Sequence, residues 1–288
     1  MQHSSSGDDI QFRVPLIAKL LYVLTSGFTE QNFLGNASIP FLLKICPKKH
    51  RRNLALRLLG ISPHYFIYQW STKYDQTLSR REILELEYKR NLASRKEICE
   101  KLLRQHMRPH MTVLDFGCGP GYLAKEVSKY VKKVLAIDIS CGVIACAKEL
   151  NNDDNVQYLT SLRDSPYLVD GACVDLVYSF AVVQHLSDEL FEEMLKDIFY
   201  LVKPQGRVIC HVAIDDGSQP GIEQKKSLHI EKFIRDRYAL RMVRRPVKNI
   251  IKKIMTAGFK DPSVLEIKQL AEIEDTIAKQ HLFVFSKP

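Results

Sequence analysis

The segment Val113–Tyr122 constrains the fold of this chain more than any other stretch. An apolar run ends at Asp115, and glycines then stand at every second position, at Gly117, Gly119 and Gly121. Glycine adopts positive φ freely and lets a ligand approach the backbone closely. A helical sequence follows at once, and the first N–H groups of a helix attract negative groups. The segment therefore predicts a strand, a tight loop and a helix start that bind a small ligand.

Two common glycine loops do not fit this segment. The dinucleotide pattern G-x-G-x-x-G needs a third glycine where Tyr122 stands, and we expect that bulky side chain to obstruct close packing of helix on strand. A Walker loop is excluded because no Gly-Lys-Ser/Thr follows. Asp115 would repel a pyrophosphate and instead suits a ligand that carries a positive group near the loop.

The pattern Asp115-x-Gly117-x-Gly119-x-Gly121 resembles the first motif of class I S-adenosylmethionine (SAM) dependent methyltransferases. The resemblance implies SAM as the cofactor and methyl transfer as the reaction. It also implies a doubly wound, Rossmann-like α/β fold with a mostly parallel, seven-stranded sheet whose last strand is antiparallel. On this resemblance Asp115 and the three glycines hold the methionine part of SAM. Cys118 is interpreted as a small filler of the loop, not as a nucleophile.

A second acid, Asp138, ends the apolar strand predicted at Val134–Asp138. It follows Asp115 by 23 positions, close to the offset of about 20 residues expected of an acid that binds ribose hydroxyls. The resemblance places Asp138 on the ribose of SAM and Ile139 beside it in the cofactor site. The alternative is that Asp138 caps the helix predicted after Ser140.

A third strand is predicted at 156–160, and it leads into Ser161 and Leu162, which the resemblance assigns to the adenine of SAM. Relatives often carry an acid where Ser161 stands. We therefore expect the adenine contact to come from the backbone around Leu162 or from Asp164.

Residues 174–186 resemble the fourth motif of the family, a buried strand whose end faces the methyl group. The resemblance places Ser179 and Phe180 beside the cofactor. His185 is the candidate catalytic residue, because an imidazole with a pKa near 6.5 suits a general base at neutral pH. The alternative is a histidine that caps the following helix. No cluster of metal ligands stands out, so no metal is expected.

Three further strands complete the predicted sheet. Strand five is predicted at Val208–Ile214, after a turn in which Gln205 replaces one of the two glycines usual in relatives. An antiparallel pair is predicted from residues 263–267 and 281–285.

The net charge of +9 is unevenly spread along the 288 residues. Residues 111–220 hold 9 Lys and Arg against 16 Asp and Glu, whereas residues 40–110 hold 16 against 6 and residues 225–253 hold 11 against 2. We predict a helical N-terminal cap and substrate region at 1–107, with disordered first residues, and a SAM-binding methyltransferase domain at 108–288. A lid insertion is predicted at about 215–245.

The basic flanks leave several interpretations open. Apolar segments beside Lys48–Arg52 suit a packed helical cap, a membrane surface or lipid-like substrate, or nucleic acid. Tyr74 either closes over the methionine end of SAM, as the resemblance implies, or packs in the core. The arginines of the lid either hold a carboxylate or phosphate or lie on a solvated helix face; they are Arg235, Arg237, Arg241, Arg244 and Arg245.

We therefore expect a methyltransferase that acts on an oxygen, nitrogen or carbon nucleophile of a small or lipid-like metabolite. An RNA or protein methyltransferase and a non-catalytic scaffold with this fold are the alternatives. Seven cysteines without CxxC spacing, and no recognisable signal peptide, predict a cytoplasmic protein with reduced thiols. Peripheral contact with a membrane through the basic N-terminal region remains open.

Overall fold

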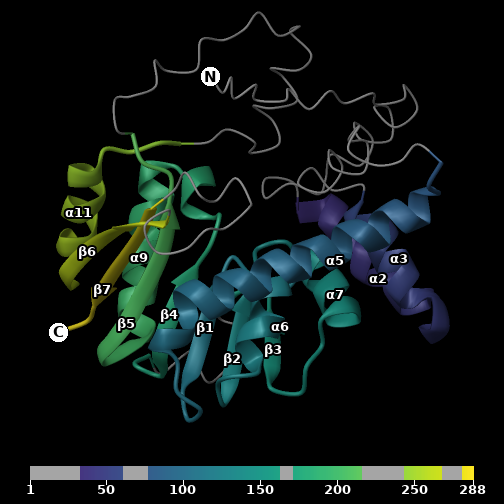
Figure 1. Cartoon of the computed structure of the whole chain (residues 1–288), viewed down its shortest axis with the longest axis horizontal. Coiled ribbons are helices and arrows are strands. Elements are labelled where there is room, and N and C mark those ends of the chain that lie inside the picture. Colours follow the sequence, from purple (N-terminus) through teal and green to yellow (C-terminus); the bar gives the residue numbers. More distant parts are fainter. Residues whose placement is uncertain (1–32, 61–76, 163–170, 216–242, 268–280) are drawn as a thin grey trace, which may run out of the picture.

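The described residues of the computed structural model form a seven-stranded sheet in the order β3-β2-β1-β4-β5-β7-β6 (Figure 1). They are residues 33–60, 77–162, 171–215, 243–267 and 281–288. The strands are β1 (Thr112–Phe116), β2 (Lys133–Ile137), β3 (Val156–Leu159), β4 (Val174–Ser179), β5 (Val202–Val212), β6 (Lys260–Glu266) and β7 (His281–Ser286). Neighbours from β3 to β5 pair in parallel, and β7 is antiparallel to both β5 and β6. The predicted doubly wound, mostly parallel sheet is confirmed.

Helices cover both faces of the sheet. The helices are α2 (Phe33–Ile45), α3 (Lys48–Leu59), α5 (Arg80–Ile98), α6 (Tyr122–Ser128), α7 (Cys141–Leu150), α9 (Asp188–Leu201) and α11 (Val247–Thr256). The end of α5 packs with α6 and α7 in one core cluster, and α9 packs with α11 in the other. Since both faces are covered, the central strands are buried almost along their whole length, as a parallel sheet requires.

Local sequence sets the ends of these helices. Ser79 begins α5 with a capping box, in which its hydroxyl accepts from the Glu82 N–H and the Glu82 carboxylate accepts from the Ser79 N–H. Ser187 caps α9, whose buried residues recur every three or four positions. Beyond α5 the chain continues through a π-helical turn, η3 (Cys99–Leu103), and a 3-10 turn, η4 (Arg104–His106).

The prediction for strand five was wrong at both ends. β5 begins at Val202, which already pairs with Val174 of β4. Residues 203–206 then form an irregular stretch, and regular pairing with β4 resumes at Arg207. Gln205 has φ of 62°, a left-handed conformation that favours glycine, which accounts for the glycines expected in this turn. Ile214 lies beyond β5 and forms an isolated bridge with Arg245.

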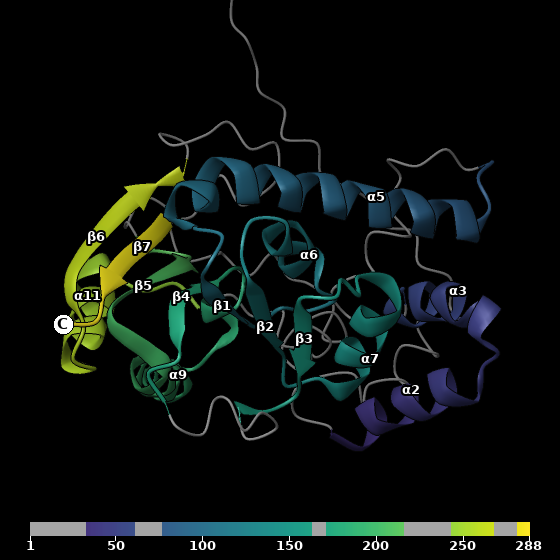
Figure 2. The same cartoon turned by 90° about the horizontal axis from the view of Figure 1, so that it is seen from below.

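The described part of the predicted N-terminal cap is helical. α2 and α3 lie at one end of the molecule and pack on α7 (Figure 2). The domain boundary at residue 107 stays a prediction, and Met107 lies in the same core cluster as Val113 of β1. No helix among the described residues is long and apolar enough to cross a bilayer.

Candidate active site

The glycine loop between β1 and α6 is tied to the end of β2. The N–H groups of Gly117 and Cys118 both donate to the Ile137 carbonyl oxygen, at 2.8 and 2.9 Å. The Gly119 N–H donates to Asp138 Oδ2 at 2.9 Å. The loop and the two predicted cofactor acids therefore meet at the carboxyl end of the sheet, where open α/β sheets bind ligands.

Two glycines of this loop are required by close packing inside the protein. Gly117 has φ of 78°, and a Cβ there would overlap the side chain of Val182. Gly121 has φ of 79°, and a Cβ there would overlap the hydroxyl of Tyr158 in β3. Sequence reasoning assigned these glycines to a tight turn that a ligand approaches, and it missed both packing contacts.

The expected obstruction by Tyr122 was wrong. The Tyr122 ring is buried in the cluster formed with α2, α3 and α7, and it packs on Tyr88 of α5 with ring centroids 5.6 Å apart. The bulk of Tyr122 therefore points away from the strands. Gly121 is the residue that allows helix and sheet to approach closely.

Asp115 is the next-to-last residue of β1, and it is buried, at 2% exposure. The pKa of Asp115 is raised to about 8, chiefly because the side chain is buried; the hydroxyl of Tyr178 opposes this rise and the charge of Asp138 adds to it. Asp115 Oδ2 has no hydrogen-bond partner within the part of the chain that the structure describes. A buried carboxylate oxygen without a partner suits a cationic ligand, such as the ammonium of an amino acid.

Cys118 is enclosed in the loop at 8% exposure. Burial, with the nearby charges of Asp115 and Asp138, raises the pKa of this thiol well above its ordinary value. The thiol therefore stays protonated at neutral pH, in agreement with the filler interpretation.

Asp138 joins the glycine loop to the helix that follows. Its Oδ2 accepts from the Gly119 N–H and its Oδ1 accepts from the Ser140 N–H, both at 2.9 Å. The helix cap is Ser140, whose hydroxyl accepts from the Val143 N–H at 3.3 Å, so the cap alternative for Asp138 was wrong. Burial raises the pKa of Asp138, and the two backbone hydrogen bonds lower it. Each oxygen keeps a further lone pair for a ligand hydroxyl.

Three further predicted cofactor residues, of which Ser161 and Leu162 were assigned to the adenine, lie near the carboxyl ends of β2 and β3. Ile139 is 51% exposed, which is unusual for a large apolar side chain. Ser161 and Leu162 are half-buried directly after β3, and Leu162 packs against the core. Asp164 lies outside the described residues, as does Tyr74. The adenine assignment stays a prediction.

The segment after β4 carries Ser179 and Phe180, and its shape depends on a residue that sequence reasoning missed. The Ser179 hydroxyl donates to the Phe116 carbonyl oxygen at 2.9 Å. Phe180 stacks on the buried ring of His211 in β5, with centroids 5.4 Å apart and an interplanar angle of 7°. His211 Nδ1 accepts from the N–H of Ala181 at 3.1 Å. Ala181 has φ of 60°, a left-handed conformation that is strained for a residue with a side chain. The hydrogen bond from its N–H to His211 therefore stabilises this conformation.

Arg245 holds the same segment from the other side. Its guanidinium donates to the Val183 carbonyl at 3.1 Å, the Leu186 carbonyl at 2.6 Å and the Asp188 carboxylate at 2.6 Å. The residue is 3% exposed, so the expectation that it holds a substrate anion or lies on a solvated face was wrong. Arg244 is exposed, and Arg235, Arg237 and Arg241 lie outside the described residues.

His185 lies in the short turn η6 (Val183–His185), between these two anchors. It is half-buried, and its Nε2 lies 3.5 Å from Nε2 of Gln184. Since Val182 contacts Gly117, the turn stands next to the glycine loop. Ser187 caps α9, so the cap alternative for His185 was wrong, whereas its role as a base stays a prediction.

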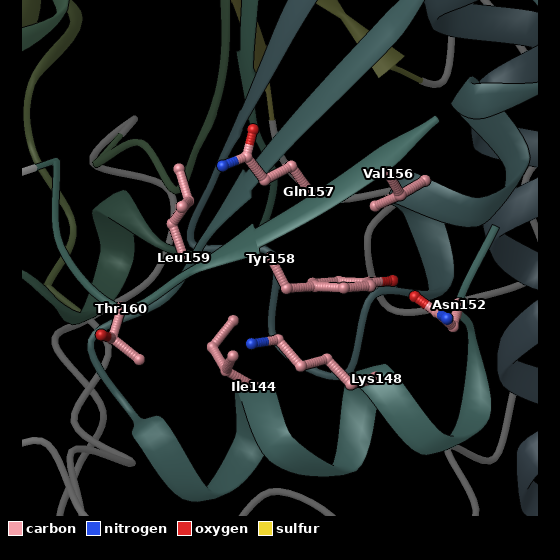
Figure 3. A pocket seen from close by; sticks show the side chains of 8 residues that line it. All are labelled: Ile144, Lys148, Asn152, Val156, Gln157, Tyr158, Leu159 and Thr160. Atoms are coloured by element: carbon pink, nitrogen blue, oxygen red, sulfur yellow. The ribbon is translucent and has the colours of Figure 1, made fainter. Parts of the chain in front are cut away.

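An open hollow of about 590 Å³ lies between α7 and β3 (Figure 3). Lys148 and Tyr158 are among its lining residues, and none of the predicted cofactor residues lines it. We therefore do not place the cofactor there. Within the described ranges, no three His, Cys, Asp or Glu side chains are grouped to hold a metal ion.

Comparison with known proteins agrees with this arrangement. Residues 114–210 match a family model described as a methyltransferase domain. Phosphoethanolamine N-methyltransferase 1 of Triticum aestivum is 32% identical over 34% of this chain and 20% of its own length. Ribosomal protein L11 methyltransferase of Thermosipho africanus is 32% identical over 41% of this chain and 44% of its own length. The chain thus spans less than half of either relative.

A solved structure shares the fold. It is a chain in the complex between a Haloferax volcanii methyltransferase activator and a candidate methyltransferase, with a TM-score of 0.51 and 17% identity. The alignment covers 70% of this chain and 94% of that one. The family match, the strand order and the geometry of the glycine loop agree. The chain therefore carries a class I SAM-dependent methyltransferase domain, whose family cofactor is S-adenosylmethionine.

Proposed function

We propose that this chain binds SAM and transfers its methyl group to an oxygen, nitrogen or carbon nucleophile of a small or lipid-like metabolite. The observation that carries the proposal is the pair of acids beside the glycine loop. The Asp138 carboxylate accepts from two backbone N–H groups and keeps lone pairs for hydroxyls. Asp115 is a buried carboxyl group that keeps its proton up to about pH 8 without ligand, and that a bound ammonium would hold ionised. SAM carries both groups.

The protein itself contributes by aligning the acceptor with the methyl group of SAM. When bound, SAM supplies the methyl group and the thioether leaving group. Holding an acceptor at the attack distance contributes about 7–11 kcal/mol in well-oriented systems. The segment after β4, which is held by hydrogen bonds to His211 and Arg245, would provide one wall for the acceptor, and His185 on it would accept the proton of a hydroxyl acceptor.

The basic flanks favour a second candidate, an RNA or protein methyltransferase. Residues 40–110 hold 16 Lys and Arg against 6 Asp and Glu, whereas residues 111–220 are acidic. We favour a small or lipid-like acceptor because the region that carries the site is negative, and a nucleic-acid substrate would be repelled there. Incubating labelled SAM with separated metabolite, lipid, RNA and protein fractions distinguishes the candidates by which fraction gains label.

Asp138→Ala is expected to weaken SAM binding by about 1.5–3 kcal/mol, the range for hydrogen bonds to a charged group. Titration calorimetry with SAM measures the change. Asp154→Ala is the matched control, because Asp154 is an exposed carboxylate in the loop before β3. Equal affinity of the Asp138 variant and wild type would exclude the ribose role.

If wild type binds SAM but labels no fraction, the chain is a scaffold rather than an enzyme.

Asp115→Asn is expected to flatten the pH dependence of stability in the absence of cofactor. The pKa of Asp115 is about 8 in the folded chain, against about 4 when unfolded. The folded state therefore keeps a proton that the unfolded state loses, and the free energy of unfolding falls as pH rises from about 4 to about 8, by at most about 1.4 kcal/mol per pH unit. Urea denaturation across that range measures the slope, and an unchanged slope in the variant would contradict the assignment.

A further inference from the structure

The outer face of α2 is apolar and is not covered by the residues that the structure describes. Phe41 and Ile45 are each 62% exposed, and Leu42 is 39% exposed. These positions lie on one side of the helix, because Ile45 is three residues from Leu42 and four from Phe41, and residues at these spacings are neighbours on a helix surface. The opposite side, with Ile39 and Leu43, is buried in the cluster that includes α7. Grouped exposure of large apolar side chains is typical of an interaction surface.

The segment that contains α2 and α3 has no acidic residue. Between residues 33 and 60 there is no Asp or Glu, and the cations are Lys44, Lys48, Lys49, Arg51, Arg52 and Arg57. Lys48 and Lys49 begin α3, where the helix dipole is already positive and no acid stands in the first turn. Such an arrangement opposes helix stability, and it concentrates positive potential beside the end of α2.

Arg51 fixes the corner between the two helices. Its Nε donates to the Cys46 carbonyl at 2.9 Å, and its Nη2 donates to the Lys44 carbonyl at 3.0 Å. Arg52 pairs with Glu85 of α5. These two arginines are therefore committed to holding the cap together, and the corner keeps the start of α3 next to the end of α2 (Figure 2).

The three lysines remain available for a partner. Lys44, Lys48 and Lys49 are exposed and make no ion pair with any residue in the described ranges. Apolar side chains next to uncommitted lysines match the boundary between the headgroups and the acyl chains of a bilayer. Lysines close to an anionic leaflet are attracted to its phosphates.

We propose that this docking surface, formed by Phe41, Leu42 and Ile45 with Lys44, Lys48 and Lys49, binds an anionic lipid bilayer. Charge complementarity selects anionic over neutral lipid. The apolar side chains favour a bilayer over nucleic acid, because a nucleic-acid backbone offers phosphates but no hydrocarbon region to receive Phe41 and Ile45. The docking is independent of methyl transfer.

Vesicle sedimentation of the full chain tests the proposal. Wild type is expected to sediment with vesicles of phosphatidylcholine and phosphatidylglycerol, less strongly as salt increases, and not with phosphatidylcholine alone. Lys44→Ala, Lys48→Ala and Lys49→Ala together are expected to weaken binding about a hundredfold, at about fivefold per lysine. The double variant Phe41→Ser and Ile45→Ser is also expected to bind more weakly.

Matched controls are exposed residues elsewhere on the molecule. Leu190→Ser with Met255→Ser removes apolar side chains that are 49% and 58% exposed on α9 and α11, and both control substitutions together are expected to leave vesicle binding unchanged. A control for charge replaces exposed lysines on α5, α9 and β6 with alanine; these are Lys89, Lys196 and Lys260. Calorimetry with SAM shows that each variant is folded and reports on the proposed function separately.

Three outcomes would overturn the docking proposal. The first outcome is that the wild type binds neutral and anionic vesicles equally, or binds neither. The second is that the control variants lose as much vesicle binding as the variants of the docking surface. The third outcome is that the lysine variant loses affinity for a single-stranded RNA while the Phe41 and Ile45 variant binds vesicles like wild type. That outcome would assign the surface to nucleic acid.

Discussion

Arg245→Ala is expected to lower the free energy of unfolding by about 2–4 kcal/mol, because it strips buried carbonyl groups of their donors. The guanidinium is the hydrogen-bond partner of the Val183 and Leu186 carbonyls and joins them to Asp188. Without it the segment after β4 loses one of its two anchors. Urea denaturation measures the loss, and reduced methyl transfer at saturating SAM is expected to accompany it.

Two substitutions make this expectation specific. Arg244→Ala changes the exposed neighbour of Arg245 and is expected to alter stability by less than about 0.5 kcal/mol. Arg245→Lys keeps the charge but lacks the planar fork of donors that reaches three oxygens, so it is expected to fall between alanine and wild type. Equal stability of Arg245→Ala and wild type would show that Arg245 does not anchor the segment.

His185→Ala is expected to lower the rate of methyl transfer to a hydroxyl acceptor by about 10²–10⁴, the range for loss of a general base. The turn that carries His185 lies beside the glycine loop through the contact of Val182 with Gly117. The rate is measured with labelled SAM at saturation, so that only the step after cofactor binding is compared. The affinity for SAM is expected to stay unchanged.

A histidine remote from the site is the control for this experiment. His106 lies in η4, before β1, and contacts Arg207 in the middle of β5, so His106→Ala is expected to leave the rate unchanged. A loss below about tenfold in His185→Ala would mean that the residue is not a general base. A free amine or an activated carbon is nucleophilic without a base, and the identity of the labelled product therefore decides whether the expectation applies.

Much of the fold is predictable from the sequence because its signals are local. Each of β1 and β2 is an apolar run that ends at an acid or close to one, and the glycines after Asp115 specify the turn. The predicted start of strand five was too late, because the residues before Val208 were interpreted as a turn. Gln205 in that stretch does have a left-handed backbone, which a residue with a side chain rarely adopts. The sequence there shows a loop, whereas pairing with β4 already begins at Val202.

The anchors of the site are not predictable in this way, because they join residues that are distant in the chain. Arg245 bonds to Val183 across 62 positions, and His211 bonds to Ala181 across 30. In the sequence Arg245 is one basic residue among many, and His211 is one polar residue in an apolar strand. Only the pairing of β4 with β5 brings His211 close to Ala181, whose N–H donates to it.

The position of β7 between β5 and β6 sets an order of assembly for this sheet. β6 precedes β7 in the chain, yet it is joined to the sheet through β7 and not through β5. β6 is therefore joined to the rest of the sheet only once residues 281–286 have docked on β5. This late, non-local step is expected to slow folding of that edge compared with β1 and β2. A substitution that weakens β7, such as Phe283→Ala, should then release β6 as well, and hydrogen exchange of the two strands should rise together.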